Sequence, residues 1–141
     1  MYQKITIVGN LGRDPEMRYT PNQQAVTNIN VATNRRWTGN DGQRAEETTW
    51  FRVSVWGNQA EAVNQYLRQG SKVLVEGRLR PDPQTGGPRV WTRQDGTMGA
   101  NFEITANRVV FLSSKAEDVA FQSSPSDMGG PEQIQEDEIP F

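Results

Sequence analysis

Apolar and polar residues alternate in five separate runs within residues 1–112. The clearest run, residues 50–56, places Phe51, Val53 and Val55 between polar or large aromatic residues. A period of two is typical of β-strands, because successive side chains point to opposite faces of a sheet. The other runs cover residues 4–8, 28–32, 72–80 and 102–112. The sequence therefore predicts an all-β domain with five strands.

One segment, residues 58–70, interrupts the alternation between the third and fourth runs. Asn58 and, three residues later, Glu61 match the capping box that begins many helices. Gly70 stands where a glycine commonly follows the last turn. The apolar stripe between them has helical spacing and consists of Ala62, Val63, Tyr66 and Leu67. We predict one short helix between the third and fourth strands.

This order of elements is that of an OB-fold, a five-stranded Greek-key barrel whose exposed strand face and loops bind oligonucleotides. Alternation alone also fits an SH3-like barrel, but the position of the helix favours the OB-fold. Residues 38–47 and 81–89 are rich in Gly or Pro. We expect both segments to form long, flexible hairpin loops that project beyond the barrel.

The pattern ends near residue 112, and the charge divides at the same point. Residues 1–112 hold 14 Lys and Arg against 10 Asp and Glu, a net charge of +4. Residues 113–141 hold 1 against 7, a net charge of −6, and their polar composition has no sustained period. We predict a barrel domain (1–112), a disordered linker (113–135) and an acidic tip (136–141).

The tip joins three acidic residues to two apolar side chains and a terminal carboxylate. It reads Glu136, Asp137, Glu138, Ile139, Pro140 and Phe141. A partner protein could hold the apolar side chains in a pocket and the carboxylates on a basic rim. The alternative is an end that only increases solubility, but a terminal Ile-Pro-Phe does not serve that purpose. The sequence therefore predicts a partner-binding tip.

Most enzyme classes are excluded by composition, because the chain contains neither Cys nor His. Thiol nucleophiles, disulfides, zinc fingers and histidine-based triads all need these residues. The glycine-rich segment 9–15 lacks the Gly-Lys-Ser/Thr ending of a phosphate-binding loop and predicts a bulge and turn. We expect no enzyme activity, no cofactor and no metal. No apolar run approaches the ~20 residues of a membrane span, and no signal peptide is recognisable, which favours a soluble cytoplasmic protein.

The third run carries the first candidate functional residues. Its polar face presents Trp50, Arg52 and Trp56, and exposing two large aromatics there is unfavourable without a use. They could cover a neighbouring element or a subunit interface. Alternatively, they could stack on unpaired bases while Arg52 meets phosphate, and such stacking contributes about 1–3 kcal/mol per base. The second interpretation is favoured.

Two further tryptophans lie beside arginines, as in grooves that stack bases and follow a phosphate backbone. Trp37 follows Arg35 and Arg36, and Trp91 lies between Arg89 and Arg93. They could instead pack the loops beside a solvated run of charges. The complete set of candidate contacts also includes Arg78 and Arg80 of the fourth run: Arg35, Arg36, Trp37, Trp50, Arg52, Trp56, Arg78, Arg80, Arg89, Trp91 and Arg93.

Several motifs resemble the bacterial-type single-stranded DNA-binding proteins, the SSB family. They are residues 8–16 with Arg18-Tyr19, 50–57, 66–71, 75–77 and the tip 136–141. The resemblance implies an OB-fold homotetramer that wraps single-stranded DNA, stacking bases on Trp37, Trp50, Trp56 and Trp91. It also implies a cytoplasmic, nucleoid-associated role in bacterial DNA replication, recombination and repair. The tip would then recruit the proteins of those processes.

Overall fold

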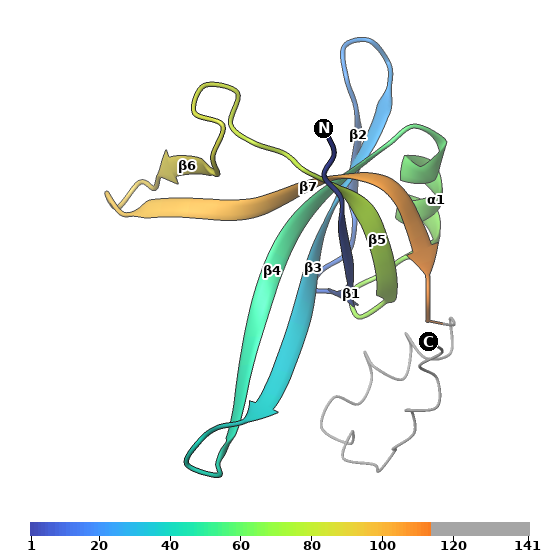
Figure 1. The fold of residues 1–141 in the computed structure, drawn as a ribbon. Helices are drawn as coiled ribbons and strands as arrows, with labels where there is room; N and C mark the ends of the chain where they lie inside the picture. Colours follow the sequence, from blue (N-terminus) through green and yellow to red (C-terminus); the bar gives the residue numbers. More distant parts are fainter. Residues whose placement is uncertain (114–141) are drawn as a thin grey trace.

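The computed structural model describes residues 1–113 of the chain. The rest of the predicted linker and the tip lie outside the described residues. Figure 1 shows a barrel from which hairpins project. The elements in chain order are β1 (Ile5–Leu11), β2 (Glu16–Tyr19), β3 (Ala25–Thr38), β4 (Arg44–Trp56), α1 (Asn58–Tyr66), β5 (Lys72–Leu79), β6 (Arg89–Thr92) and β7 (Met98–Phe111).

Five of the strands close the barrel. The order runs β1-β5-β7-β4-β3, and pairing of β1 with β3 at Asn10–Ala32 and Leu11–Val31 closes the circle. β4 and β7 pair in parallel, whereas the other pairs are antiparallel. The helix follows β4 and precedes β5 in the chain. The predicted five-stranded OB-fold with one short helix is confirmed.

The interior of the barrel contains the apolar members of the alternating runs. Ile29, Val53 and Ile104 are at most 1% exposed and lie side by side across β3, β4 and β7. Val63 and Leu67 add the apolar stripe of α1 to the same core. This buried face determines which side of each strand is left for solvent, because the side chains alternate.

Two strands, β2 and β6, were not predicted. Within residues 1–113, β2 pairs only with β3 and β6 pairs only with β7, so both extend hairpins instead of closing the barrel. Every residue of β6 is exposed, and β2 has no fully buried residue. Backbone pairing with a longer strand stabilises them, and such pairing leaves no apolar alternation in the sequence.

Residues 38–47 lie at the end of a projecting hairpin, as expected, but the expected long loop there is wrong. β3 runs to Thr38 and β4 starts at Arg44, so the connection contains only residues 39–43. The amide of Gly39 donates to the carbonyl of Gln43 at 2.7 Å, and Gly42 has a φ of 79°. The glycines therefore form a tight turn between two long strands. Residues 81–88 do form a connection without a strand, which ends at Arg89.

The predicted ends of the helix are also wrong in detail. Gly57, with a φ of 76°, is the N-cap, and no side chain caps the helix start as the Asn58–Glu61 box would. The C-terminal carbonyls are capped by Arg68, whose Nη1 donates to Asn64, Gln65 and Leu67. Gly70 lies beyond the helix in a turn closed by the Ser71 amide and the Arg68 carbonyl. Backbone geometry and an arginine replace the expected caps.

The side chains of Thr27 and Gln59 attach α1 to the barrel by three hydrogen bonds. Thr27, which is fully buried, donates its hydroxyl to the Ala60 carbonyl at 2.7 Å. The side-chain amide of Gln59 donates through Nε2 to the Asn107 carbonyl at 3.1 Å, and its Oε1 accepts from the backbone N–H of Val109 at 2.9 Å. The Gln59 side chain thus pairs with β7 as a strand would. Within residues 1–113, no helix is long and apolar enough to cross a membrane.

Candidate nucleic-acid interface

The outer face of the barrel carries polar rows that cross several strands. Arg52 of β4 pairs in register with Glu103 of β7, and the Arg80 amide donates to the Glu103 carbonyl at 2.9 Å just past β5. Partners in register point to the same face of a sheet. Arg52, Glu103 and Arg80 therefore lie in one row on the face opposite the core.

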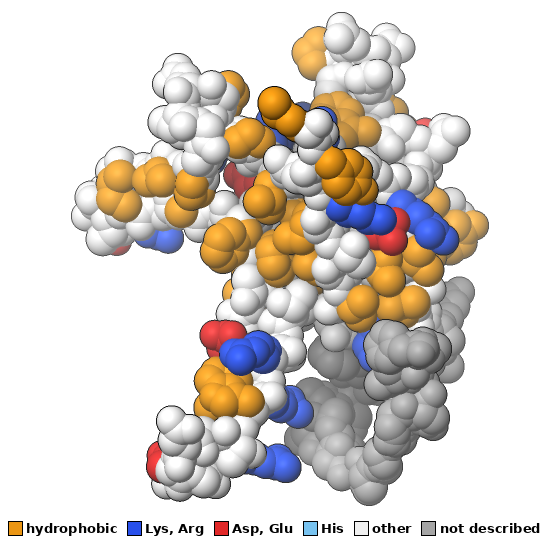
Figure 2. All heavy atoms as spheres, viewed as in Figure 1, with side chains coloured by type: hydrophobic (Ala, Val, Ile, Leu, Met, Phe, Trp, Pro, Cys, Tyr) orange, Lys and Arg blue, Asp and Glu red, His pale blue; other side chains and the backbone are white. Residues whose placement is uncertain are grey.

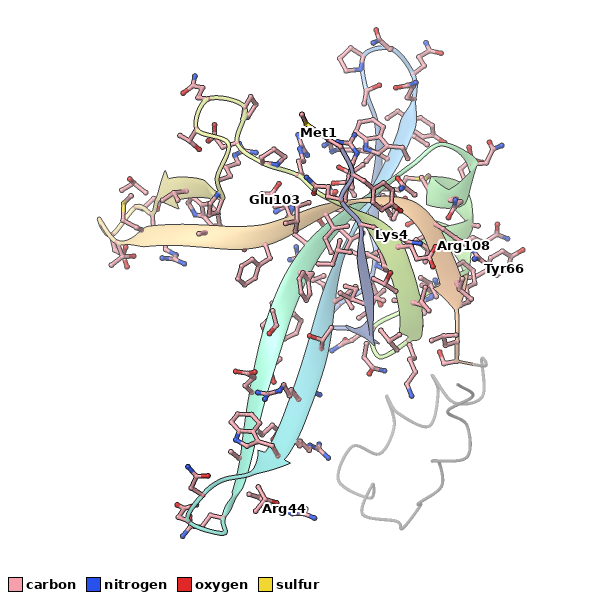
Figure 3. All side chains as sticks on the ribbon, in the orientation of Figure 1. Met1, Lys4, Arg44, Tyr66, Glu103 and Arg108 are labelled. Atoms are coloured by element: carbon pink, nitrogen blue, oxygen red, sulfur yellow. The ribbon has the colours of Figure 1, made fainter. Side chains whose placement is uncertain are left out.

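A groove lies over this face, with a volume of about 380 Å³. It is formed where the barrel meets the β6–β7 hairpin, and Figure 3 shows Glu103 on β7 near that junction. Its lining residues are Arg18, Asn28, Arg52, Ser54, Trp56, Arg80, Arg89, Trp91, Asn101 and Glu103. Five of the predicted contacts, from β4, β6 and the end of β5, are brought together here.

The groove contains four arginines and one carboxylate. Arg18, Arg52, Arg80 and Arg89 form no ion pair or side-chain hydrogen bond with any residue in 1–113. Guanidinium groups without a protein partner are suited to bind an anion, and they match phosphate oxygens well. The groove therefore has a net positive charge, and its guanidinium groups are available to bind a ligand.

Two indoles share the groove with these cations. Trp56 is 40% exposed and Trp91 is 37% exposed, so each presents part of its ring to solvent. An exposed indole supported by protein on its other side can stack on a base of any identity. The groove therefore combines two aromatic surfaces with positive charge.

Trp50 extends the aromatic row but does not line the groove. It lies on the same side of β4 as Trp56 and is 53% exposed. It lines a neighbouring hollow of about 470 Å³ together with Pro88 and Phe102. The two predicted aromatics of β4 thus occupy adjacent sites.

Trp37 does not belong to the row of Trp50 and Trp56, because it lies on the other face of the β3–β4 hairpin. The β3–β4 register is unbroken from Val26–Trp56 to Thr38–Arg44. Because side chains alternate, Trp37 shares the face of Ile29 and Val31, which is opposite to that of Trp50. It lines another hollow near the end of the hairpin, so the four tryptophans do not converge on one surface.

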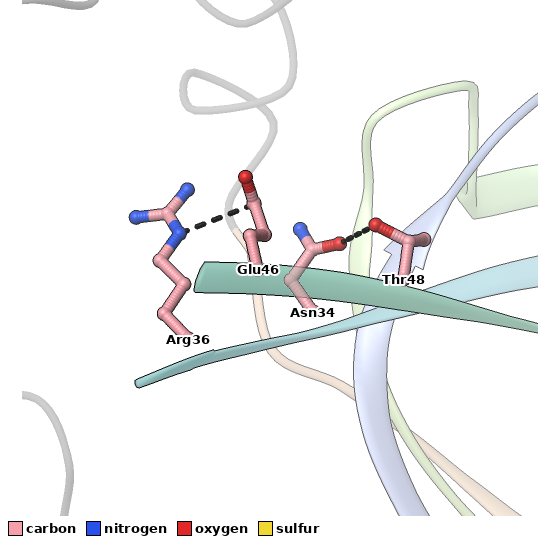
Figure 4. Close-up of polar contacts among 4 residues, drawn as sticks. All are labelled: Asn34, Arg36, Glu46 and Thr48. Atoms are coloured by element: carbon pink, nitrogen blue, oxygen red, sulfur yellow. Dashed lines mark hydrogen bonds and ion pairs between the residues drawn. The ribbon is translucent and has the colours of Figure 1, made fainter. Parts of the chain in front are cut away.

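Arg35 and Arg36 differ from the groove arginines because each has a carboxylate partner. Arg35 Nη1 lies 3.1 Å from Glu47 Oε1, and Arg36 Nε lies 3.2 Å from Glu46 Oε2. Figure 4 shows the second pair beside the hydrogen bond from Thr48 to Asn34. The Arg35 guanidinium also lies 4.4 Å from the centre of the Trp37 ring. Both charges are locally compensated, although Figure 2 shows basic side chains along this hairpin.

The last two predicted arginines also lie outside the groove. Arg78 pairs in register with Thr105 on the outer face and is exposed, but it is not among the lining residues. The Arg93 guanidinium donates to the Met98 carbonyl and, at 3.3 Å, to Thr97 Oγ1. Arg93 is therefore used within its own hairpin.

Sequence reasoning did not assign five lining residues of the groove to the interface: Arg18, Asn28, Ser54, Asn101 and Glu103. Arg18 lies on β2, which has no apolar alternation, so nothing local placed it beside β4. Its position within the motif that resembles the SSB family was the available signal. Within residues 1–113, no group of three or more Asp, Glu, His or Cys side chains could hold a metal ion.

Comparison with known proteins identifies the family. The model of the single-strand binding protein family matches residues 2–112. The chain belongs to this family. Single-stranded DNA-binding proteins of Helicobacter hepaticus and Wolinella succinogenes are 43% and 42% identical over 115 residues, or 82% of the chain. These matches span 64% and 67% of the two relatives.

Solved structures of the family resemble this barrel. A Plasmodium falciparum SSB in complex with single-stranded DNA has a TM-score of 0.66 and 25% identity, covering 80% of this chain and 97% of the other. A deletion mutant of the single-stranded DNA-binding protein from Thermus aquaticus has a TM-score of 0.61 and 28% identity, covering 80% and 51%. The barrel is therefore similar to those of two solved single-stranded DNA-binding proteins.

Proposed function

We propose that this chain binds single-stranded DNA without sequence preference. Bases stack on Trp56 and Trp91, and the arginines of the groove contact the phosphates. The observation that carries the proposal is the presence of two exposed indoles and four arginines without described partners in one groove. Membership of the single-strand binding protein family supports it.

The same geometry favours single strands over duplex. An indole can stack on a base only when that base is free of its neighbours, and every base offers a ring face. Stacking therefore supplies affinity without reading sequence. The arginines add an electrostatic contribution that decreases with salt, because phosphate binding releases counterions.

Titration with oligo-dT tests the proposal. We expect strong quenching of tryptophan fluorescence and weaker binding to a duplex of equal length. If all four arginines contact phosphate, the logarithm of affinity should fall with the logarithm of salt at a slope of about −3. R80Q should weaken binding more than R108Q, which removes an equal charge outside the groove. Absence of quenching, or equal affinity for duplex, would overturn the proposal.

We further propose that residues 136–141 recruit replication, recombination and repair proteins, and that the chain acts without catalysis in the bacterial cytoplasm, associated with the nucleoid. The acidic and apolar composition of the tip supports recruitment. Deleting these residues should abolish partner binding and leave the barrel able to bind DNA. The deletion should also raise DNA affinity modestly at low salt, because an acidic segment competes with phosphate. Loss of DNA binding would contradict this division of roles.

A homotetramer is the proposed assembly. Exposed apolar side chains outside the groove, such as Val8, Tyr66 and Phe111, support burial against other copies. Sedimentation of the free protein and of its complex with oligo-dT would report both the assembly and the number of nucleotides covered. A monomer at micromolar concentration would refute it.

A further inference from the structure

The space above Gly99 in the β6–β7 hairpin is filled by two side chains from the facing strand and turn. Gly99 is the register partner of Trp91. A Cβ atom at Gly99 would lie 2.8 Å from Trp91 Cε2 and 2.8 Å from Arg93 Nη2, closer than real contacts allow. The φ of Gly99 is not in the left-handed region, so the constraint is one of space and not of backbone conformation.

The Arg93 guanidinium is held in this position by the turn. Its Nη1 donates to the Met98 carbonyl and to Thr97 Oγ1. The turn itself is closed by the Arg93 amide, which donates to the Thr97 carbonyl at 2.7 Å. These bonds hold the guanidinium beside Trp91, and Arg93 does not line the groove. A group that already donates to two protein oxygens has fewer donors left for phosphate.

Arg89 provides the contrast within the same hairpin. It lies on β6 two residues before Trp91, lines the groove and has no described side-chain partner. Arg89 and Arg93 therefore flank Trp91 in the sequence but have different surroundings. Arg89 lines the groove, whereas the Arg93 guanidinium and the Trp91 ring lie over the same glycine, Gly99.

We propose that Gly99 and Arg93 are positioning residues for Trp91, an inference that rests on the proposed binding of single-stranded DNA. Gly99 supplies a flat floor for the indole, and the Arg93 guanidinium restrains the ring from the side. The indole is then oriented before a base arrives, which lowers the entropy lost on binding. Arg93 acts through Trp91 and makes no phosphate contact.

Salt dependence separates the two roles of arginine. Wild type, R89Q and R93Q are titrated with oligo-dT across a series of salt concentrations. Each lost phosphate contact should reduce the salt slope by about 0.7. We expect that reduction in R89Q, whereas R93Q keeps the wild-type slope and binds more weakly at every salt concentration. A reduced slope in R93Q would overturn the assignment.

Substitution of Gly99 tests whether this glycine supports the indole of Trp91. G99V should displace the indole and reduce affinity toward that of W91A, a loss of roughly 5- to 150-fold for one stacked base. G99A should lose less, because the clashing atoms belong to side chains that can shift. Circular dichroism and thermal unfolding of each variant establish that the barrel is retained. Wild-type affinity in a folded G99V would overturn the inference.

A double-substitution cycle isolates the coupling to Trp91. If Arg93 and Gly99 act only through the indole, R93Q and G99V should cause little further loss in a W91A background. Additive losses would show that they act independently of Trp91 and would overturn the inference. If wild type itself does not bind oligo-dT, the proposed function fails before these comparisons apply, so the two failures are distinguishable.

Discussion

The indole of Trp50 lies directly over the backbone of Gly12. A Cβ atom added to Gly12 would be 2.5 Å from Trp50 Cζ3 and 2.6 Å from Cη2. Gly12 follows β1, and its amide donates to the Asn30 carbonyl of β3 at 3.0 Å. The segment after β1 therefore reaches across β3 to an exposed aromatic of β4. A glycine that the sequence assigned to a bulge and turn is in contact with a candidate stacking residue.

Replacing Gly12 should change DNA binding more than stability. G12V requires the Trp50 ring to move, so we expect a loss of binding free energy approaching that of W50A, about 1–3 kcal/mol. Titration with oligo-dT measures the loss. G87A is the control, because a Cβ atom there would lie 3.7 Å from Thr85 Oγ1, an ordinary contact, and the φ of Gly87 is not in the left-handed region. Equal affinities for G12V and G87A would contradict the expectation.

The tryptophans should contribute unequally. W56A and W91A remove indoles from the groove, and each should cost about 1–3 kcal/mol of binding free energy. W37A should cost less for a short oligonucleotide, because Trp37 lies on the opposite face of the β3–β4 hairpin. Isothermal titration with oligonucleotides of increasing length measures these losses. A larger loss in W37A than in W56A at the shortest length would place the primary site on the hairpin.

Removing the carboxylates that compensate Arg35 and Arg36 should strengthen DNA binding. In E46Q/E47Q the two arginines lose their ion partners, so we expect higher affinity and a steeper salt slope. The unfolding free energy should change by less than about 1 kcal/mol per pair, because exposed ion pairs contribute little. Denaturant unfolding provides that measurement. Unchanged affinity and slope would mean that DNA does not approach this hairpin.

The pKa of Asp95 tests the hydrogen bonds that this carboxyl accepts in the β6–β7 turn. Hydrogen bonds from the Thr97 hydroxyl and amide lower the pKa of this carboxyl from its ordinary value of 3.8. The stabilisation is therefore present above the unfolded pKa and is lost as pH falls through the lower folded pKa. An NMR titration of Asp95 should show this, and T97V should move its pKa back toward 3.8. An equal pKa in both proteins would contradict the role of the hydroxyl.

The barrel and one face of β4 could be predicted because a period of two determines which side chains of a strand face the core. Val53 and Val55 are buried, so Arg52 and Trp56 must lie on the outer face. The alternation also shows that Trp37 shares the face of Val31, but only once β3 is known to continue to Thr38. The Gly- and Asp-containing segment after it indicated a long loop instead.

The remaining members of the groove depend on contacts between distant parts of the chain. Arg18 reaches the groove because β2 pairs with β3, and Glu103 does so because β7 pairs in parallel with β4. No local pattern specifies such pairings. Likewise, the compensation of Arg35 by Glu47 depends on a register that is set at the other end of the hairpin.

Because the β3–β4 ladder is uninterrupted, the register at its barrel end is coupled to the register at the far end of the hairpin. Its barrel end contains the buried pair Ile29–Val53, and its far end pairs the exposed Trp37 with the half-buried Ala45. A slip by one residue anywhere along a ladder without a bulge turns every side chain of the moved strand to the other face. Misplacing Trp37 in this way would therefore expose the centre of the barrel. The buried residues Ile29 and Val53 therefore fix the face on which the exposed Trp37 lies.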